Sequence, residues 1–400
     1  MKKNHIADQD RSGSAHRAVA VRMEGITKRF GSLIANDRID ITVYQGEVHA
    51  LVGENGAGKT TLMNILYGML KPDHGRIVVD GSEVPVERGY LGTAYGIGMI
   101  HQHFMLVRPF TVLENIILGA EPRKGILLDL KTARSKVSEL MHRYGIEMDL
   151  DRRVEDLSVG EEQRVEILKV LYRNARIIIM DEPTAVLTPQ EIRRLFETIR
   201  MLVEAGHTLI FITHKLEEVM QIADRVTVLR RGRVIATKPV GEVDPEELAV
   251  MMVGRKVEVS TRAERSVDGQ SLLRFEDVSL RSSRNLDLLK SISLDLRRGE
   301  ILGICGVEGN GQDELFEVAI GITRPTSGKI YFQDVDITDC SAQSRLRMGI
   351  GHIPPDRIRM GIVPGMTVEE NMILGRHTEP ALTGQVFLKH DAIRNLTVCL

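Results

Sequence analysis

A short glycine-rich stretch begins at residue 53 of this chain and returns, altered, at residue 306. The first copy, residues 53–61, reads GENGAGKTT and fits the phosphate-binding pattern GxxxxGK(S/T). In this pattern, backbone N–H groups at a helix N-terminus surround the phosphates, a lysine adds positive charge, and a hydroxyl binds Mg²⁺. The second copy, residues 306–314, reads GVEGNGQDE and lacks the lysine and both threonines. We therefore expect only the first copy to bind a nucleotide.

The similarity between the two halves extends well beyond this loop. Residues 111–119, TVLENIILG, return as residues 367–375, TVEENMILG. A repeat of this length corresponds to one whole domain per copy rather than to one hairpin of a solenoid. The sequence therefore predicts a flexible tail at 1–18, a first domain at 19–253, a polar linker at 254–270 and a second domain at 271–400.

The repeat also predicts where the second copy stops. Leu400 falls opposite residues 144–147 of the first copy when the two are aligned. Later segments of the first copy have no counterpart, so we expect the second domain to be incomplete. A missing central strand would leave apolar surface and strand edges uncovered, and we expect residues 271–400 to be poorly stable alone.

Charge and cysteine content narrow the functional classes. With 53 basic and 55 acidic residues, the chain has a net charge of −2 and no general attraction to nucleic acid. Cys305, Cys340 and Cys399 have no metal-like spacing and indicate reduced thiols in the cytosol, and Cys305 is expected in a core strand. No secretory signal opens the chain, and no apolar run reaches the roughly 20 residues that span a bilayer. A role at a membrane would need another subunit.

The segments around the first loop follow the pattern of an α/β protein. After Lys59, apolar residues from Leu62 to Met69 fall at i, i+3, i+4 and i+7, which predicts one buried face of a helix. Residues 177–180, IIIM, suit a strand buried on both faces of a parallel sheet. Residues 208–213 predict a second such strand. The loop is therefore expected to join a strand to a helix.

Candidate catalytic side chains follow these two strands. Asp181 and Glu182 emerge where phosphate-loop NTPases hold Mg²⁺ with an aspartate and polarise the attacking water with a neighbouring acid. We assign Asp181 to the metal and Glu182 to the water; the alternative, a strand that merely ends in two acids, is disfavoured by Lys59. His214 follows the second strand and is placed to donate to a γ-phosphate, although a lone histidine there is usually structural.

A polar segment before a further helix is another candidate. Residues 157–161 read LSVGE and precede apolar residues on one helix face. Ser158 and Gly160 can therefore present N–H groups and the positive end of the helix dipole to an anion. The alternative is an ordinary capped helix.

In this order, the segments resemble those of an ABC-type ATPase over nearly the whole chain. They are the loop at 53–61, HQHFMLV around Gln102, LSVGE, IIIMDEPT and THK. The tandem arrangement is similar to the ATP-binding subunit of simple-sugar and nucleoside importers, and HQHFMLV, LSVGE and PTAVLTPQ favour the nucleoside branch. The resemblance implies a P-loop NTPase of ABC type with two tandem nucleotide-binding domains. Each would have a mixed sheet core and a helical subdomain, the second being truncated.

The resemblance also implies residue roles. Phe30 would stack on adenine, although an aromatic packed at a strand end is the alternative. Gln102 would contact Mg²⁺ or the water, His214 would be the switch histidine, and residues 157–161 would close over a nucleotide held by the opposite domain. The ATP site would comprise Phe30, Gly53, Glu54, Asn55, Gly56, Ala57, Gly58, Lys59, Thr60 and Thr61. The metal ligands would be Thr60, Gln102 and Asp181, the catalytic residues Glu182, His214 and Gln102, and the signature segment Leu157, Ser158, Val159, Gly160 and Glu161.

The chain departs from the family at three places. Thr188 stands where many relatives carry an aspartate, but it can still begin a helix through the capping box TPQE. In the second copy, residues 312–314 remove one positive charge and add two negative charges near the phosphates, which reverses the local field. Pro355 replaces the glutamate of an otherwise similar loop, IPPDR.

The sequence thus predicts the ATP-hydrolysing subunit of a bacterial importer of nucleosides or simple sugars, with ATP and Mg²⁺ as cofactors. Its partners would be transmembrane permease subunits and, indirectly, a substrate-binding protein, with no nucleic acid. It would lie on the cytoplasmic face of the membrane as a peripheral subunit. The alternatives are a catalytically silent nucleotide-binding scaffold and a soluble ABC ATPase acting on ribosomes or DNA, which generally keeps both lysines.

Overall fold

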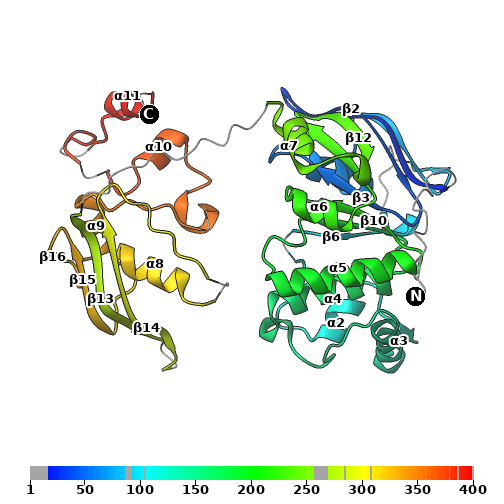
Figure 1. The fold of residues 1–400 in the computed structure, drawn as a ribbon, viewed down its shortest axis with the longest axis horizontal. Coiled ribbons are helices and arrows are strands. Elements are labelled where there is room, and N and C mark those ends of the chain that lie inside the picture. The colour runs from blue at the N-terminus through cyan, green and yellow to red at the C-terminus, as the bar shows by residue number, and fades with distance from the viewer. Residues whose placement is uncertain are drawn as a thin grey trace, which may run out of the picture. The chain divides into compact units, whose positions relative to one another are not determined.

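The structure is a computed structural model in which most of the chain is described. The described residues are 17–85, 92–102, 104–125, 127–255, 269–282, 285–306, 309–355, 357–377, 379–384 and 387–398. The chain separates into two compact units, Met1–Ser260 and Thr261–Leu400, coloured along the chain in Figure 1. Most of the predicted tail and linker, together with Cys399 and the acidic residue that follows Pro355, lies outside the described residues.

A six-stranded sheet forms the centre of the first unit. Its order is β12 (Arg233–Pro239), β11 (Arg225–Arg230), β3 (Val48–Val52), β10 (Thr208–Ile212), β9 (Ile177–Asp181) and β6 (Ile97–Ile100). The strands from β11 to β6 are parallel, and β12 pairs antiparallel with β11. Every residue of β9 and β10 is buried. The predicted pair of parallel strands covered on both faces is therefore confirmed.

Alternate residues of β9 face different layers of the unit. Ile177 and Ile179 pack in a cluster with α1 (Lys59–Tyr67), whereas Ile178 and Met180 pack in a cluster with other helices. These helices are α2 (Val112–Ile117), α3 (Leu130–Arg143), α4 (Val159–Tyr172) and α5 (Pro189–Glu204). The alternation is the period of two that an extended strand imposes. A third cluster joins β11 to α6 (Leu216–Ile222) and α7 (Pro245–Val253). Figure 1 labels both helices.

Helix α1 begins at Lys59, directly after the glycine-rich loop, as predicted. It buries Leu62, Ile65 and Leu66. The helix ends at Tyr67 because Gly68 adopts a φ of 89° and closes the last turn, as glycine does at helix ends. Met69 therefore lies beyond the helix and is 59% exposed, so its predicted place on the buried face is wrong.

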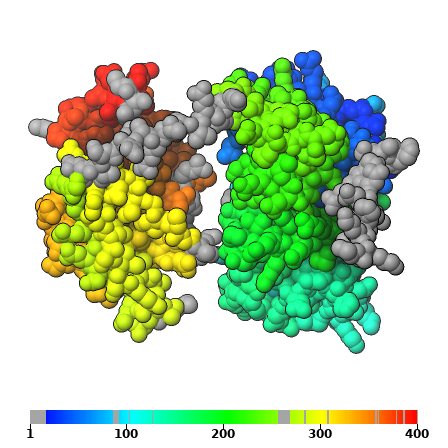
Figure 2. Space-filling model, viewed as in Figure 1, coloured from blue at the N-terminus to red at the C-terminus, as the bar shows by residue number. Residues whose placement is uncertain are grey.

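Helix α5 begins with the predicted capping box. The backbone N–H of Glu191 donates to Thr188 Oγ1 at 3.3 Å, and the Glu191 carboxylate accepts from the Thr188 N–H at 2.9 Å. The inner face of α5 is apolar and buried, whereas Arg193, Glu197 and Arg200 are exposed. This outer face forms part of the surface of the first unit in Figure 2.

A second, antiparallel sheet completes the first unit. Its order is β2 (Leu33–Tyr44), β1 (Val19–Phe30), β4 (His74–Val79) and β5 (Ser82–Glu83). The smaller elements are η2 (Gly92–Tyr95), β7 (Arg123–Lys124), β8 (Leu127–Leu128), η3 (Val154–Asp156) and η4 (Val240–Glu242). Within the part of the chain that the structure describes, no helix is both long and apolar enough to cross a bilayer.

The second unit repeats the antiparallel sheet. Its order is β14 (Asp287–Arg297), β13 (Ser271–Arg281), β15 (Ser327–Phe332) and β16 (Val335–Asp336). Its helices are α8 (Gln312–Ile320), α9 (Ala342–Arg347), η5 (Arg357–Gly361), α10 (Val368–Met372) and α11 (His390–Val398). A small core of Val278, Leu315, Val318 and Ile330 joins α8 to the sheet.

The segment that corresponds to β3 is not a strand in the second unit. Residues 301–306 have no regular structure, Ile301 is 85% exposed and Cys305 is exposed. The prediction that Cys305 lies in a core strand is therefore wrong. In the first unit β3 is hydrogen-bonded between β10 and β11, and among residues 269–398 that the structure describes no parallel strand takes their places. Without ladder partners, the backbone N–H and C=O groups of this exposed segment are left to solvent.

Candidate functional site

The glycines of the loop at 53–61 are required by its backbone shape. Gly56 and Gly58 adopt φ values of 81° and 98°, which side chains disfavour. A Cβ on Gly58 would lie 2.3 Å from the Ala35 carbonyl oxygen, and a Cβ on Gly53 would lie 2.3 Å from the Leu229 carbonyl oxygen. The loop therefore curls against two neighbouring segments between β3 and α1, the strand-to-helix position expected for phosphate binding.

Lys59 spans this loop from the first turn of α1. Its Nζ donates to the carbonyl oxygens of Gly53 at 2.7 Å and Glu54 at 3.0 Å, and the residue is 6% exposed. Burial lowers the pKa of Lys59, while the charges of Glu182 and Asp181 act to raise it. The ammonium group is thus held at the loop, close enough to the carboxylates of Asp181 and Glu182, at the end of β9, to feel their charges.

Asp181 ends β9 and lies beside Thr60. It is 4% exposed, and burial raises its pKa, while a hydrogen bond with the Thr60 side chain and the charge of Lys59 oppose the rise. Thr60, Asp181 and Gln102 offer a hydroxyl, a carboxylate and an amide oxygen. Mg²⁺ prefers such oxygen ligands and is usually held by one or two carboxylates together with substrate phosphates. The neighbouring Thr60 hydroxyl and Asp181 carboxylate therefore fit the predicted Mg²⁺ site. The Gln102 side chain contacts Glu182.

Three predicted catalytic side chains meet at the edge of the sheet. Glu182 Oε1 lies 3.0 Å from His214 Nδ1, and the Gln102 side-chain amide donates to Glu182 Oε2 at 3.4 Å. They come from the ends of β9, β10 and β6, and the carboxyl ends of parallel strands share one edge of a sheet. The carboxylate that could accept a proton from water is therefore held by two neighbours.

Glu182 also has an unusual backbone. Its φ of 48° lies in the left-handed region, which residues other than glycine, asparagine and aspartate seldom occupy. The Glu182 N–H donates to the Ile212 carbonyl oxygen at 3.0 Å, so neighbouring β10 restrains it. Strained residues of this kind cluster at active sites and persist only where their surroundings hold them.

Phe30 and the signature segment lie at other places in the first unit. Phe30 ends β1, is 49% exposed, and its ring centroid lies 5.6 Å from Lys28 Nζ. Ser158 caps α4 in a capping box with Glu161, whose carboxylate also binds Arg152 at 2.7 Å. The hydrogen bonds of the signature segment are thus made within its own neighbourhood rather than to the loop at 53–61.

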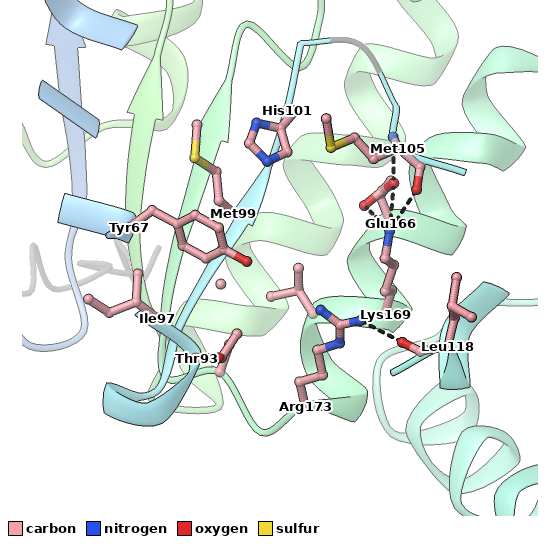
Figure 3. A pocket seen from close by; sticks show the side chains of 13 residues that line it. Tyr67, Thr93, Ile97, Met99, His101, Met105, Leu118, Glu166, Lys169 and Arg173 are labelled. Atoms are coloured by element: carbon pink, nitrogen blue, oxygen red, sulfur yellow. Dashed lines mark hydrogen bonds and ion pairs between the residues drawn. The ribbon is translucent and has the colours of Figure 1, made fainter. Parts of the chain in front are cut away.

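Sequence reasoning missed a cavity of about 230 Å³ between β6 and α4 (Figure 3). At its edge, Glu166 and Lys169 of α4 hold the segment that follows Gln102. The Met105 N–H donates to the Glu166 carboxylate at 3.0 Å, and Lys169 Nζ donates to the Met105 carbonyl oxygen at 2.9 Å (Figure 3). A Glu–Lys pair three residues apart on a helix was a visible signal, but it did not identify a distant backbone as the partner.

Comparison with known proteins places the chain in a family. The family described as ABC transporter matches residues 36–185 and 289–397. The chain is 46% identical over 375 residues to the nucleoside import ATP-binding protein NupA of Lactococcus lactis subsp. cremoris, covering 94% of this chain and 74% of that protein. It is 45% identical to the guanosine import ATP-binding protein NupO of Bacillus subtilis, covering 88% and 69%. A ribose import ATP-binding protein, RbsA 1 of Rubrobacter xylanophilus, is 40% identical, covering 92% and 72%.

Solved structures agree on the fold. A crystal structure of the ADP conformation of an ATP-binding cassette of an ABC transporter has a TM-score of 0.51 and 29% identity, covering 59% of this chain and 99% of that one. A nucleotide-free cassette has the same TM-score and identity. One assignment follows from these relatives, from the glycine-rich loop with its buried lysine and from the carboxylates at the end of β9. The chain belongs to the ABC transporter family and has its P-loop NTPase fold, with a mixed sheet and helices.

Proposed function

We propose that this chain is the ATP-hydrolysing subunit of a bacterial importer that takes up a nucleoside through separate transmembrane permease subunits. The observation that carries the proposal is the position of Lys59 at a glycine-rich loop facing Asp181 and Glu182. The solute is proposed from the two import proteins named for a nucleoside and for guanosine. A simple sugar is the second candidate, because a ribose import protein is 40% identical.

The residues of the first unit divide the work of hydrolysis. Lys59 and the loop N–H groups bind the phosphates, and Phe30 stacks on the adenine ring. Glu182 orients the attacking water and accepts its proton, while His214 holds Glu182 in place and donates toward the γ-phosphate.

Thr60, Asp181 and Gln102 would hold Mg²⁺. When bound, this ion would supply positive charge against the negative charge of the phosphates. The buried carboxylate of Asp181 is suited to that role because burial makes its negative charge unfavourable without a cation.

We further propose that the two units are tandem nucleotide-binding domains, near residues 19–253 and 271–400, and that the second is degenerate. The signature segment, residues 157–161, would close over a nucleotide held by an opposite domain. Closure would move the permease at the cytoplasmic face of the membrane, and a substrate-binding protein would deliver the solute. The formal net charge of −2 supports a chain without a nucleic-acid partner.

Uptake by the complete transporter in proteoliposomes tests this function. Wild-type protein should hydrolyse ATP and import labelled guanosine, and Glu182→Gln should lower turnover on the order of 10²-fold. Glu197→Gln, on the exposed face of α5, is the matched control and should leave turnover unchanged. Import of labelled ribose instead would assign the chain to the sugar branch. Near-normal hydrolysis by Glu182→Gln would remove Glu182 from the mechanism.

Two further results separate the alternatives. ATP binding without hydrolysis, with and without the permease, would indicate a silent scaffold. Co-sedimentation of the chain with ribosomes in the absence of membranes would indicate a soluble ATPase of another class. We expect hydrolysis in the assembled transporter and no co-sedimentation.

A further inference from the structure

A buried carboxylate lies behind the pair formed by Glu182 and His214. Glu218, on α6, is 6% exposed. Its Oε2 accepts hydrogen bonds from Thr184 Oγ1 at 2.8 Å and from Thr213 Oγ1 at 3.0 Å. One oxygen therefore joins the segment after β9 to the segment after β10.

The two threonines are neighbours of the proposed catalytic side chains. Thr184 is two residues beyond Glu182, and Thr213 immediately precedes His214. The position of each side chain therefore depends on a short piece of backbone that is anchored to the same carboxylate.

Lys215 completes this arrangement. Its Nζ lies 3.2 Å from Glu218 Oε1 and donates to the Thr184 carbonyl oxygen at 3.1 Å. Its N–H donates to Thr213 Oγ1 at 3.0 Å. Glu218, Lys215, Thr184 and Thr213 thus form a closed set of contacts, which we name the Glu218 clamp.

The contacts of the Glu218 clamp offset the free-energy cost of burying the Glu218 carboxylate. A carboxylate taken out of water destabilises the fold unless it is paired and hydrogen-bonded, and Glu218 gains both from the clamp. The left-handed backbone of Glu182 needs restraint from its surroundings. Helix α4 adds a contact to the segment after β9, because the buried Gln163 side-chain amide donates to the Pro183 carbonyl oxygen at 2.8 Å.

We propose that Glu218 is a positioning residue for ATP hydrolysis. Its charge holds the segments that carry Glu182 and His214 in register, so that the 3.0 Å contact between them is formed before a nucleotide binds. Glu218 acts through these two side chains and does not itself touch the substrate. This proposal rests on the proposed function of the first unit.

Glu218→Gln in the full chain, assembled with its permease, tests the proposal. The glutamine side chain has the same shape as glutamate. With its oxygen toward the two threonines, its NH₂ group faces the Lys215 ammonium group, and both groups are hydrogen-bond donors only. We expect kcat to fall roughly 10- to 100-fold because small misplacements of reacting groups have effects of this size. KM for ATP should stay within about twofold, since the loop at 53–61 is untouched. Glu217→Gln, on the exposed face of the same helix, should change neither value.

A spectroscopic readout in the absence of nucleotide makes the test independent of hydrolysis. With ¹³C-labelled histidine, the His214 resonance, assigned through His214→Gln, should shift in Glu218→Gln and stay in place in Glu217→Gln. Thr213→Val removes one hydrogen-bond donor to Glu218 and little volume, and it should shift the His214 resonance in the same way. This variant replaces Glu218→Gln in the test if Glu218→Gln does not fold. If wild-type protein shows no hydrolysis, the proposed function fails. The His214 resonance then tests by itself whether Glu218 positions His214. An unmoved His214 resonance, or an equal loss of kcat in Glu217→Gln, would overturn the positioning role.

Discussion

The residues that lead directly into α1 and α8 have nearly the same glycine conformations and opposite chemistry. Gly58 and Gly311, which precede α1 and α8, have φ values of 98° and 103°, and each helix has nine residues and ends at a left-handed glycine. The first turn of α1 carries Lys59, whereas that of α8 carries Asp313 and Glu314. Acids at a helix N-terminus stabilise the helix but repel a phosphate. The comparison shows that glycines set the shape of the loop and that a few side chains decide what it can bind.

The sheets of the two units make a second contrast. The antiparallel order β2-β1-β4-β5 returns as β14-β13-β15-β16, whereas the segment that corresponds to β3 stays outside any sheet. Antiparallel neighbours can be joined by a short turn, whereas parallel neighbours need a long crossover connection. Antiparallel pairing is repeated in the second unit, including that of β13 with β15, whose partners Leu273 and Phe332 lie far apart in the sequence. Parallel pairing is not seen among the described residues of this unit.

The largest expected effect is the difference in ATP hydrolysis between a change at Lys59 and the same change at Gln312, its counterpart in the second unit. Lys59→Ala should lower ATP hydrolysis roughly 10²- to 10³-fold, because it removes a preorganised charge at the phosphates. Gln312→Ala, the matched change in the second unit, should leave hydrolysis within about twofold. Steady-state hydrolysis by the assembled transporter measures both. Equal losses would mean that both loops take part in the reaction.

A second test concerns loop shape. Gly58→Ala should destabilise the first unit by more than about 2 kcal/mol, because the left-handed strain is joined by a contact of 2.3 Å with the Ala35 carbonyl oxygen. Gly311→Ala meets its neighbours at 3.0 Å and should cost about 1–2 kcal/mol. Hydrogen exchange in α1 and α8 reports each change separately. A smaller loss at Gly58 would contradict this view of the loop.

The sequence was most informative where structure depends on nearby residues. The loop at 53–61, the buried run at 177–180 and the capping box at Thr188 follow from local spacing, and all three are found in the structure. Whether Cys305 lies in a buried strand depends on partner strands far along the chain. Its apolar neighbours in the sequence therefore gave a wrong prediction, and Cys305 is exposed. The contacts of Met105 with Glu166 and of Thr184 with Glu218 join distant segments, so local spacing does not identify these partners.

A third test uses the buried charge of Asp181. Its pKa is raised by burial, so the folded state favours the protonated form: stability gains as pH falls through the raised pKa and is lower above it. Without Mg²⁺ at neutral pH, Asp181→Asn should therefore raise the unfolding temperature of the first unit, while it abolishes Mg²⁺-dependent hydrolysis. Asp313→Asn, at the exposed start of α8, should instead lower stability slightly. Calorimetry at two pH values measures the unfolding temperature of each variant. A lower unfolding temperature for Asp181→Asn than for wild type at neutral pH would contradict the argument from burial.

The smallest expected effect is on stability, and it comes from the loss of either of two matching capping boxes. Thr111 caps α2 and Thr367 caps α10 with the same pattern, but α2 buries most of its residues and α10 buries none. Thr111→Ala should lower the unfolding free energy of the first unit by about 1 kcal/mol. Thr367→Ala should increase hydrogen exchange within α10 and leave the calorimetric transitions unchanged. A global loss from Thr367→Ala would show that α10 is coupled to its unit more strongly than its exposure indicates.

The number of nucleotides bound per chain tests the central claim most directly. Titration of the full chain with a non-hydrolysable ATP analogue and Mg²⁺, followed by calorimetry, should give one site per chain. That site should disappear in Lys59→Ala and remain in Gln312→Ala. Two sites per chain, or one that survives Lys59→Ala, would contradict the account of a single nucleotide site in the first unit.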